Sequence, residues 1–195
     1  MSSTRGRPGV LACRPPISPN LVAKQPRIRA GMQSSRTERE DTSMTQPIDP
    51  ADRAAIVDLV YAYAFHFDQN EPEKLADLFT TDSVIDYGPE FENIVGCDAI
   101  VAAIQPGLSN LFSSSAHHIT NPRVWADGDD EATGTFYIYA WHIYHDRPGD
   151  GEMWGQYHCR FRRTGEGWRI AEFTLKVMGM KNFHRDTMHT IGRRL

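Results

Sequence analysis

Side chains that can exchange protons near neutral pH stand at three separate places in the chain. Asp68 ends a helical stretch, His117 and His118 stand side by side in a later stretch, and His142 follows 24 residues after His118. A carboxylate that orients a histidine is a common arrangement for general acid–base chemistry, because histidine changes its charge between pH 5 and 8. These residues therefore indicate proton transfer as the candidate chemistry.

The two adjacent histidines cannot have the same role if their segment is a strand. Successive strand side chains point to opposite faces of a sheet. His118 then shares one face with Thr120 and Val124, and His117 shares the other face with Ile119. Both faces mix polar and apolar residues, so the pattern alone does not choose between the histidines. A bulge or a slip of one residue would exchange their places.

Asp68 lies at the edge of the apolar stripe of its helix, eight residues after Val60 and four after Ala64. It also occupies the last helical turn, where the helix dipole disfavours a carboxylate. A partly buried acid at this position needs a cation or hydrogen-bond donors nearby, and a histidine on a facing sheet would supply one. A solvated carboxylate that begins the next turn is the alternative that the pattern leaves open.

The elements that must position these residues are helices first and strands second. Asp49 and Pro50 suit the N-cap and first position of a helix over 50–70, and shorter helices are expected over 72–80 and 97–105. Strands are expected over 82–90, 91–96, 116–127, 131–146, 153–164 and 168–180. Helices followed by turn-linked strands predict an α+β fold with the sheet curled against the helices.

Charge and composition limit the classes of partner. The 195-residue chain has a net charge of -4, yet residues 1–37 hold seven basic residues and no acidic residue. The remainder has 14 basic against 25 acidic residues, which argues against nucleic acid as a partner. No apolar run approaches the roughly 18 residues of a membrane helix. Three scattered cysteines fit a reducing compartment, so a cytoplasmic protein with no membrane partner is expected.

One domain is expected between two terminal segments. Residues 1–46 are rich in Pro, Ser and Arg and lack hydrophobic periodicity, so they are expected to be a disordered or non-native leader. A targeting peptide is the open alternative for this leader. The domain is expected over 47–180. Residues 181–195 are expected to be an exposed polar tail, although such a segment could cover the entrance of a pocket.

Three stretches, taken in order, resemble a known family: YAYAFHFDQNEPEKLADLFTTDSVIDYG, HHITNPRVWADGD and GQYHCRFRRTGEGWRI. They are similar to the SnoaL-like proteins of the nuclear transport factor 2-like superfamily, and within it to scytalone dehydratase and a related dehydrochlorinase. The resemblance covers residues 50–180. It implies a cone-shaped α+β barrel in which three N-terminal helices pack on a strongly curved, mostly antiparallel sheet that encloses a pocket.

The resemblance also implies roles for individual residues. Asp68 would pair with His118, and Tyr87 and His142 would hydrogen-bond the reacting group. The implied reaction is proton abstraction followed by elimination of water or another group, without metal or cofactor. Two alternatives remain open: a polyketide cyclase in which Asp68 itself is the acid–base group, and a non-catalytic binding or assembly module similar to the small subunit of ring-hydroxylating dioxygenases.

The chain departs from the resembled dehydratase at two substrate-holding positions. The tyrosine before the helix aspartate is replaced by Phe67, and a hydroxyl-bearing residue is replaced by Gly155. We therefore expect a small hydrophobic or aromatic-like substrate that need not be the dehydratase's own. The aromatic residues expected to line its pocket are Phe65, Phe67, Phe136, Trp141 and Trp154. The resemblance, together with an aromatic outer sheet face, further implies a homodimer or homotrimer.

Overall fold

The elements of the computed structural model follow the predicted order of helices and then long strands. The structure describes residues 47–193, so the leader expected over 1–46 lies outside the described residues. The elements are α1 (Pro50–Asp68), α2 (Pro72–Ala76), β1 (Phe79–Asp86), β2 (Ile94–Val95), α3 (Cys97–Pro106), the π-helical turn η1 (Gly107–Leu111), β3 (Phe112–Ala126), β4 (Glu131–Tyr144), β5 (Asp150–Thr164) and β6 (Gly167–Lys181).

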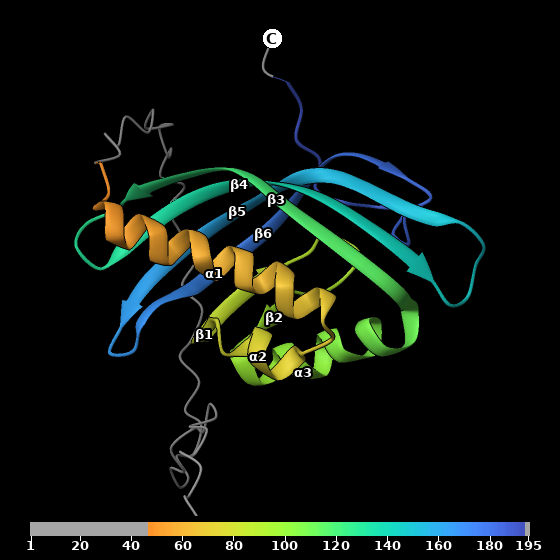
Figure 1. The fold of residues 1–195 in the computed structure, drawn as a ribbon, viewed down its shortest axis with the longest axis horizontal. Helices are drawn as coiled ribbons and strands as arrows, with labels where there is room; N and C mark the ends of the chain where they lie inside the picture. The colour runs from red at the N-terminus through yellow and green to blue at the C-terminus, as the bar shows by residue number, and fades with distance from the viewer. Residues whose placement is uncertain (1–46, 194–195) are drawn as a thin grey trace, which may run out of the picture. The chain divides into compact units, whose positions relative to one another are not determined.

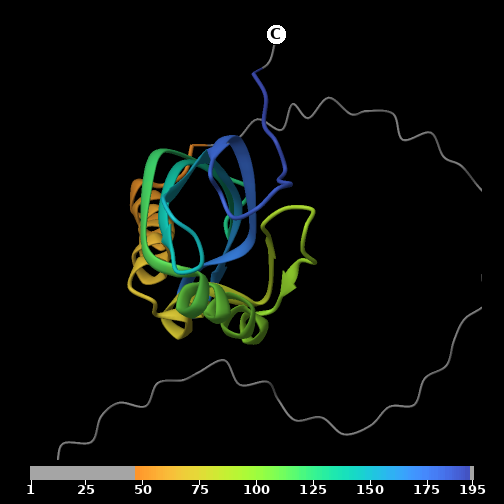
Figure 2. The same ribbon diagram turned by 90° about the vertical axis from the view of Figure 1, so that its right-hand side faces the viewer.

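The strands form one sheet in the order β2-β1-β6-β5-β4-β3. Only the pairing of β1 with β6 is parallel among these strands, and the other neighbours are antiparallel. The sheet curls strongly, as Figure 1 and the end-on view of Figure 2 show. Helix α1 packs against β3 and β6, and α3 packs against β1 and β2. The predicted α+β fold with a curved, mostly antiparallel sheet is confirmed.

Helix α1 begins where its sequence predicts and presents one buried face to the sheet. The Asp49 carboxylate accepts hydrogen bonds from the backbone N–H groups of Ala51 and Asp52, and Pro50 is the first helical residue. The helix ends at Asp68, two residues before the predicted end, and Asn70 adopts a positive φ of 55°. The buried positions at helical spacing are Ile56, Val57, Val60, Tyr63 and Ala64.

Several element boundaries differ from the sequence expectation. Residues 79–80 belong to β1 and not to the second helix, because Phe79 pairs with Ile170 of β6. Helix α3 continues through Pro106 into the wider turn η1, although a stop was expected before this proline. Pro106 has no N–H to donate within the helix, and the wider π-helical turn follows directly after it. As a result the chain enters β3 at Phe112, four residues earlier than predicted.

The N-terminal half of α1 is tied to the last hairpin of the sheet. The Asp52 carboxylate accepts hydrogen bonds from Arg163 Nη2 at 2.6 Å and from Trp168 Nε1 at 3.0 Å. Arg163 therefore joins the β5–β6 hairpin to helix α1. Because the hydrogen bonds from Arg163 and Trp168 favour the charged carboxylate, the pKa of Asp52 lies below its ordinary value.

The register of β3 decides which of its histidines faces the helices. The pairing of β3 with β4 shifts between Phe112 and Ser114 and again between Thr120 and Arg123. Between these irregularities His117 lies opposite Ala140, which is fully buried, and His118 lies opposite the partly exposed Tyr139. His117 therefore belongs to the inner face of the sheet and His118 to the outer face.

Candidate functional site

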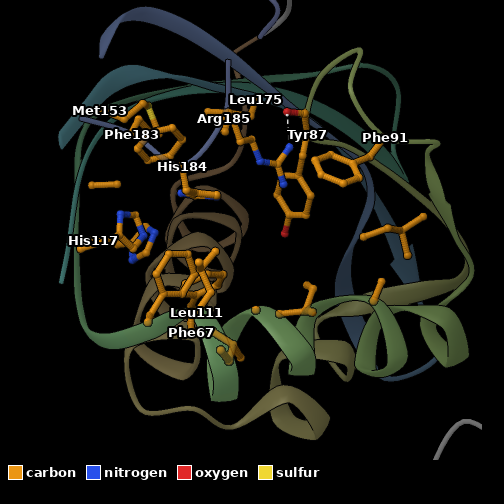
Figure 3. A pocket seen from close by; sticks show the side chains of 18 of the residues that line it. Phe67, Tyr87, Phe91, Leu111, His117, Met153, Leu175, Phe183, His184 and Arg185 are labelled. Atoms are coloured by element: carbon orange, nitrogen blue, oxygen red, sulfur yellow. Dashed lines mark hydrogen bonds between the residues drawn. The ribbon is translucent and has the colours of Figure 1, made fainter. Parts of the chain in front are cut away.

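A cavity of about 500 Å³ lies between the inner face of the sheet, the end of α1 and the segment that follows β6. We call residues 182–193 the C-terminal strap. Helix α3, the turn η1 and the segment between β1 and β2 also contribute to its wall. The lining residues are Tyr63, Phe67, Tyr87, Phe91, Glu92, Ile94, Ala103, Ile104, Gly107, Leu108, Leu111, Phe112, His117, Ala140, His142, Met153, Tyr157, Leu175, Phe183, His184 and Arg185 (Figure 3). A mostly apolar cavity of this size with a few polar groups suits a small-molecule ligand.

His117 lines the cavity and is hydrogen-bonded to Asp68, which does not itself line it. The Asp68 carboxylate accepts a hydrogen bond from His117 Nδ1 at 2.7 Å through Oδ1, and from the His117 backbone N–H at 2.8 Å through Oδ2. Ser115 Oγ donates a third hydrogen bond to Oδ1 at 2.8 Å. The His117 side chain is 6% exposed and that of Asp68 is 19% exposed. A histidine of the sheet therefore hydrogen-bonds Asp68, as expected, but the histidine is His117 and not His118.

The choice of His118 as the partner of Asp68 was wrong. His118 lies on the outer face, where its ring is 5.8 Å from that of Tyr139, and it does not line the cavity. The choice came from the family resemblance, because the alternation of the strand alone had left both histidines open. Asn121 has a positive φ of 51° and lies at the second irregularity of β3. A bulge breaks strand alternation, so positions counted across it do not report the face of a residue.

Hydrogen bonds fix the ionisation of Asp68 and the tautomer of His117. Burial alone raises the pKa of Asp68, but the hydrogen bonds and positive charge of His117 and the hydroxyl of Ser115 outweigh it and hold the pKa below its ordinary value. An ionised carboxylate only accepts hydrogen bonds. His117 Nδ1 therefore carries a proton, and when the ring is neutral its Nε2 bears the lone pair that can accept one.

His142 lies on the same wall and stays uncharged at neutral pH. It is 2% exposed, its ring lies 5.2 Å from that of His117, and it stacks on Phe112 at 4.4 Å. Burial, reinforced by the neighbouring His117 and His184, lowers the pKa of His142 to about 3. Its Nδ1 is shielded and has no hydrogen-bond partner among the described residues, which leaves Nε2 as the ring atom available to a ligand.

Two tyrosines place hydroxyl groups on the cavity wall. Tyr63 of α1 and Tyr87, which follows β1, share a hydrogen bond of 2.6 Å between their hydroxyl oxygens. One proton is used in that bond, so the other hydroxyl proton remains for a ligand. Burial raises the pKa of Tyr87 to about 12 and that of Tyr63 well above its ordinary value. Both hydroxyls are therefore neutral donors, and the predicted position of Tyr87 at the cavity agrees with the structure.

Of the five aromatic residues expected to line the pocket, Phe67 does so. Phe65 is 59% exposed, because two residues along a helix turn a side chain to the opposite side. Trp141 and Trp154 alternate with the inward-facing His142 and Met153 and so lie on the outer face, where Trp154 is 41% exposed. Phe136 faces inward but packs on Phe161 in the core and does not reach the cavity.

The strap contributes three lining residues that the sequence did not single out. Phe183, His184 and Arg185 line the cavity, although this segment was expected to be an exposed tail. Burial and the adjacent arginine charges lower the pKa of His184 to about 4. The polar sequence after β6 has no strand or helix periodicity, so these contacts had no local signal. The alternative that this segment covers the entrance of the pocket, which the sequence left open, agrees with these contacts.

The strap is anchored to the end of β1 and to β6. Glu90 Oε1 accepts hydrogen bonds from the backbone N–H groups of Asp186 and Thr187 at 2.8 and 2.6 Å. His189 Nε2 lies 2.9 Å from the Asp86 carboxylate, and backbone hydrogen bonds join Val177 of β6 to residues 189 and 191. These contacts hold the lining residues of the strap over the cavity.

Two further features bear on the expected class of protein. Within residues 47–193, no group of three or more His, Cys, Asp or Glu side chains is arranged to hold a metal ion. No helix in this same range is long and apolar enough to cross a membrane.

A curved α+β sheet that encloses an Asp–His pair defines a class of small-molecule-binding domain, and comparison with known proteins places the chain within it. The family model of the SnoaL-like domain matches residues 50–174. The chain belongs to this family, and it shares its fold with a nuclear transport factor 2-like superfamily protein from Salmonella enterica, 16% identical with a TM-score of 0.61.

Three solved structures illustrate the similarity. A proposed scytalone dehydratase from Novosphingobium aromaticivorans is 28% identical with a TM-score of 0.70, over 74% of this chain and 96% of that chain. A proposed aromatic ring hydroxylase from the same organism is 29% identical with a TM-score of 0.65, over 69% and 95%. A hexachlorocyclohexane dehydrochlorinase from Novosphingobium barchaimii, 15% identical with a TM-score of 0.63 over 73% and 96%, shares the fold.

Proposed function

We propose that the protein is a small-molecule lyase in which His117, oriented by Asp68, removes a proton from carbon and a leaving group departs from the neighbouring carbon. The observation that carries this proposal is the Asp68–His117 hydrogen bond of 2.7 Å at the wall of a cavity of about 500 Å³. The names of two structural neighbours, a proposed dehydratase and a dehydrochlorinase, support elimination as the type of reaction.

His117 is the base in this reaction and Asp68 is its partner. His117 Nε2 accepts the proton while Nδ1–H remains bonded to the carboxylate, which stabilises the imidazolium that forms. The electron pair of the broken C–H bond becomes the carbon–carbon double bond, and the C–O bond to a hydroxyl group breaks. The hydroxyl leaves as water after it takes back the proton held by His117.

The neutral donors on the wall act on the oxygen at which charge develops. The spare hydroxyl proton of the Tyr63–Tyr87 pair, or a proton on His142 Nε2, can hydrogen-bond a carbonyl or a departing hydroxyl. Because burial keeps His142 uncharged and the tyrosines protonated, these groups bind oxygen without competing with His117 for the substrate's proton.

Asp68 is a poorer candidate for the base than His117. Its two oxygens already accept three hydrogen bonds, and its pKa lies below the ordinary value. These contacts disfavour the cyclase alternative in which Asp68 itself exchanges the proton. They leave the base role to the histidine.

A non-catalytic binding module is the second candidate function. The cavity of about 500 Å³ supports it without the Asp68–His117 pair, because such a module would need the cavity and not the proton transfer. In this case the Asp68–His117 pair is structural. Replacing either residue would then reduce stability without removing a catalytic rate.

Hydrogen–deuterium exchange at carbon tests the proposal without knowledge of the natural substrate. The purified protein is incubated in D2O with 2-tetralone, a cyclic ketone with acidic C–H groups, and NMR follows the exchange; loss of water from scytalone is followed by absorbance. We expect catalysis by the wild type. We expect His117→Gln and Asp68→Asn to lower both rates by about 10²–10⁴-fold while remaining folded.

His118→Gln is the matched control, because this neighbour lies on the outer face. It should keep the wild-type rates. The lyase proposal is overturned if the wild type catalyses neither reaction, or if His117→Gln exchanges as fast as His118→Gln. A binding module is indicated if 2-tetralone stabilises the wild type and the His117→Gln variant equally while neither accelerates exchange.

A further inference from the structure

Arg185 brings a positive charge from the strap to the cavity. Its Nη1 donates a hydrogen bond of 3.0 Å to the backbone carbonyl of Tyr87. Its guanidinium lies over the Phe91 ring at 4.6 Å and over the Tyr87 ring at 5.5 Å. Figure 3 shows this side chain extending toward Tyr87 and Phe91, with His117 on the opposite side of the view. The guanidinium is thus held in place by two rings and one carbonyl.

No carboxylate neutralises this guanidinium among the residues that the structure describes. No Asp or Glu oxygen within 47–193 forms an ion pair with Arg185, whereas Arg160, Arg162 and Arg163 each have such a partner. The nearby Glu90 is occupied by two backbone N–H groups, and Glu92, which also lines the cavity, is exposed. Burial lowers the pKa of Arg185, as expected for a charge that has lost water without gaining an ion pair.

The remaining donors of Arg185 are suited to a planar anion. A guanidinium has five N–H donors, and the protein uses one of them in the bond to Tyr87. Two parallel donors match the two oxygens of a carboxylate, which makes the bidentate pair both specific and strong. Arg185 is the one arginine or lysine among the described residues that line the cavity, which favours a ligand with a single negative charge over a phosphate.

We infer that the cavity binds a small cyclic carboxylic acid, with its carboxylate on Arg185 and its ring against the apolar wall. This inference names the substrate class of the same site, and it rests on the proposed function for the part of the molecule that faces His117. A substrate anchored at one end by Arg185 would present a carbon–hydrogen bond at the other end to His117 Nε2.

A matched pair of probes tests the inference by calorimetry. 2-Naphthoic acid and 2-naphthamide have the same shape and differ in charge. We expect the wild type to bind the carboxylate at least about tenfold more tightly than the amide, since hydrogen bonds to charged groups are stronger than neutral ones. Arg185→Gln should lose this preference and bind the two probes within about twofold of one another. Arg185→Lys keeps the positive charge but lacks the two parallel N–H donors, so its preference for the carboxylate over the amide should be intermediate.

Arg169→Gln is the control, because Arg169 bonds Glu166 in the distant β5–β6 hairpin, and it should keep the wild-type preference. Equal binding of both probes by the wild type overturns the inference. So does an undiminished preference in folded Arg185→Gln, or a failure of both probes to bind at millimolar concentration. If the preference for the carboxylate depends on Arg185 but the protein does not catalyse hydrogen–deuterium exchange at carbon, the anion site is supported and the lyase proposal is refuted. If the exchange depends on His117 but the carboxylate is not preferred, the lyase proposal is supported and the anion site is refuted.

Discussion

Asp68 accepts three hydrogen bonds from groups of the protein, and their geometry orients His117. The backbone N–H and Nδ1 of His117 each bond a different oxygen of the carboxylate, which fixes the ring relative to its own strand. Ser115, two residues earlier on the same face of β3, supplies the third bond. The pair is therefore a unit of one helix end and one strand segment, and Ser115 is a positioning residue for it.

Ser115→Ala tests whether the serine contributes to the low pKa of Asp68. Loss of a donor to the ionised carboxylate should raise the pKa of Asp68 toward its ordinary value, because burial then meets less opposition. NMR titration of the Asp68 carboxyl carbon measures the pKa. The free energy of unfolding at neutral pH should fall by about 1.5–3 kcal/mol, the range for a hydrogen bond to a charged group. Ser114→Ala, on the exposed face, is the control, and an Asp68 pKa that does not differ between the two variants would contradict the role given to Ser115.

The aspartate of this pair was predictable and its histidine was not. Asp68 stands where an apolar stripe meets the end of a helix. This pattern also fits a solvated carboxylate, and the family resemblance selected the partly buried one. The choice between His117 and His118 depends on strand register, which is set by irregularities at Phe112–Ser114 and Thr120–Arg123. These arise from pairing with β4, a contact that the sequence of β3 alone does not contain.

At the scale of elements, strand β5 carries a close backbone contact that its sequence marks only by a glycine. A Cβ atom at Gly155 would collide with the backbone carbonyl oxygen of Lys176 on β6. The β5–β6 register shifts at this residue. Gly155 is also where a hydroxyl-bearing residue of the resembled dehydratase was aligned. A side chain at this position would require the two strands to move apart, so its absence follows from the local packing of this chain.

Gly155→Ala should destabilise the sheet. Relief of the collision requires a backbone shift, which typically costs about 1–3 kcal/mol of unfolding free energy. Urea denaturation measures this loss, and Gly165→Ala is the control because a Cβ there meets open space. Met153 and Tyr157 line the cavity on either side of Gly155, so probe affinity should fall as well. Equal denaturation midpoints for the two variants would show that β5 adapts without cost.

The strap depends on a different kind of contact, a side chain that caps backbone donors. Glu90→Ala removes the acceptor of the Asp186 and Thr187 N–H groups. We expect faster hydrogen exchange at these two amides, measured by NMR, and weaker binding of 2-naphthoate, because Arg185 is next to them in the chain. Glu73→Ala is the control, since its exposed side chain lies in α2 and does not line the cavity. Unchanged exchange in Glu90→Ala would mean that the contacts of residues 189–191 with β6 hold the strap by themselves.

For the whole molecule, the order of elements was predictable from local patterns, and closure of the cavity was not. Helical spacing in α1 and turn-linked strands predicted the curved sheet, which the structure and the family match bear out. The strap reaches the cavity only because β6 runs parallel to β1 and the chain then returns across the end of β1. Contacts between segments some 100 residues apart leave no periodicity in either segment.

Burial of neutral histidines makes the stability of the domain dependent on pH. The pKa of His142 is lowered to about 3 and that of His184 to about 4, in both cases chiefly by burial. In the unfolded chain both would titrate near 6.5. The unfolded state therefore binds more protons below that value. The stabilisation is complete above pH 6.5 and is lost as the pH falls toward the folded values.

His142→Phe tests this linkage. Phenylalanine can keep the stacking on Phe112 and cannot bind a proton, so the variant should lose stability more slowly on acidification. Each buried neutral histidine contributes a slope of up to about 1.4 kcal/mol per pH unit below pH 6.5. Urea denaturation between pH 7 and pH 4.5 should therefore show the wild type losing more unfolding free energy than His142→Phe, whatever the difference in stability between the two proteins at pH 7. This range stays above the ordinary carboxylate pKa values, so Asp68 contributes little to the difference.

His118→Phe, changed on the outer face, is the control, and its curve of unfolding free energy against pH should run parallel to that of the wild type. A His142→Phe curve that also runs parallel would show that His142 is not held neutral by burial.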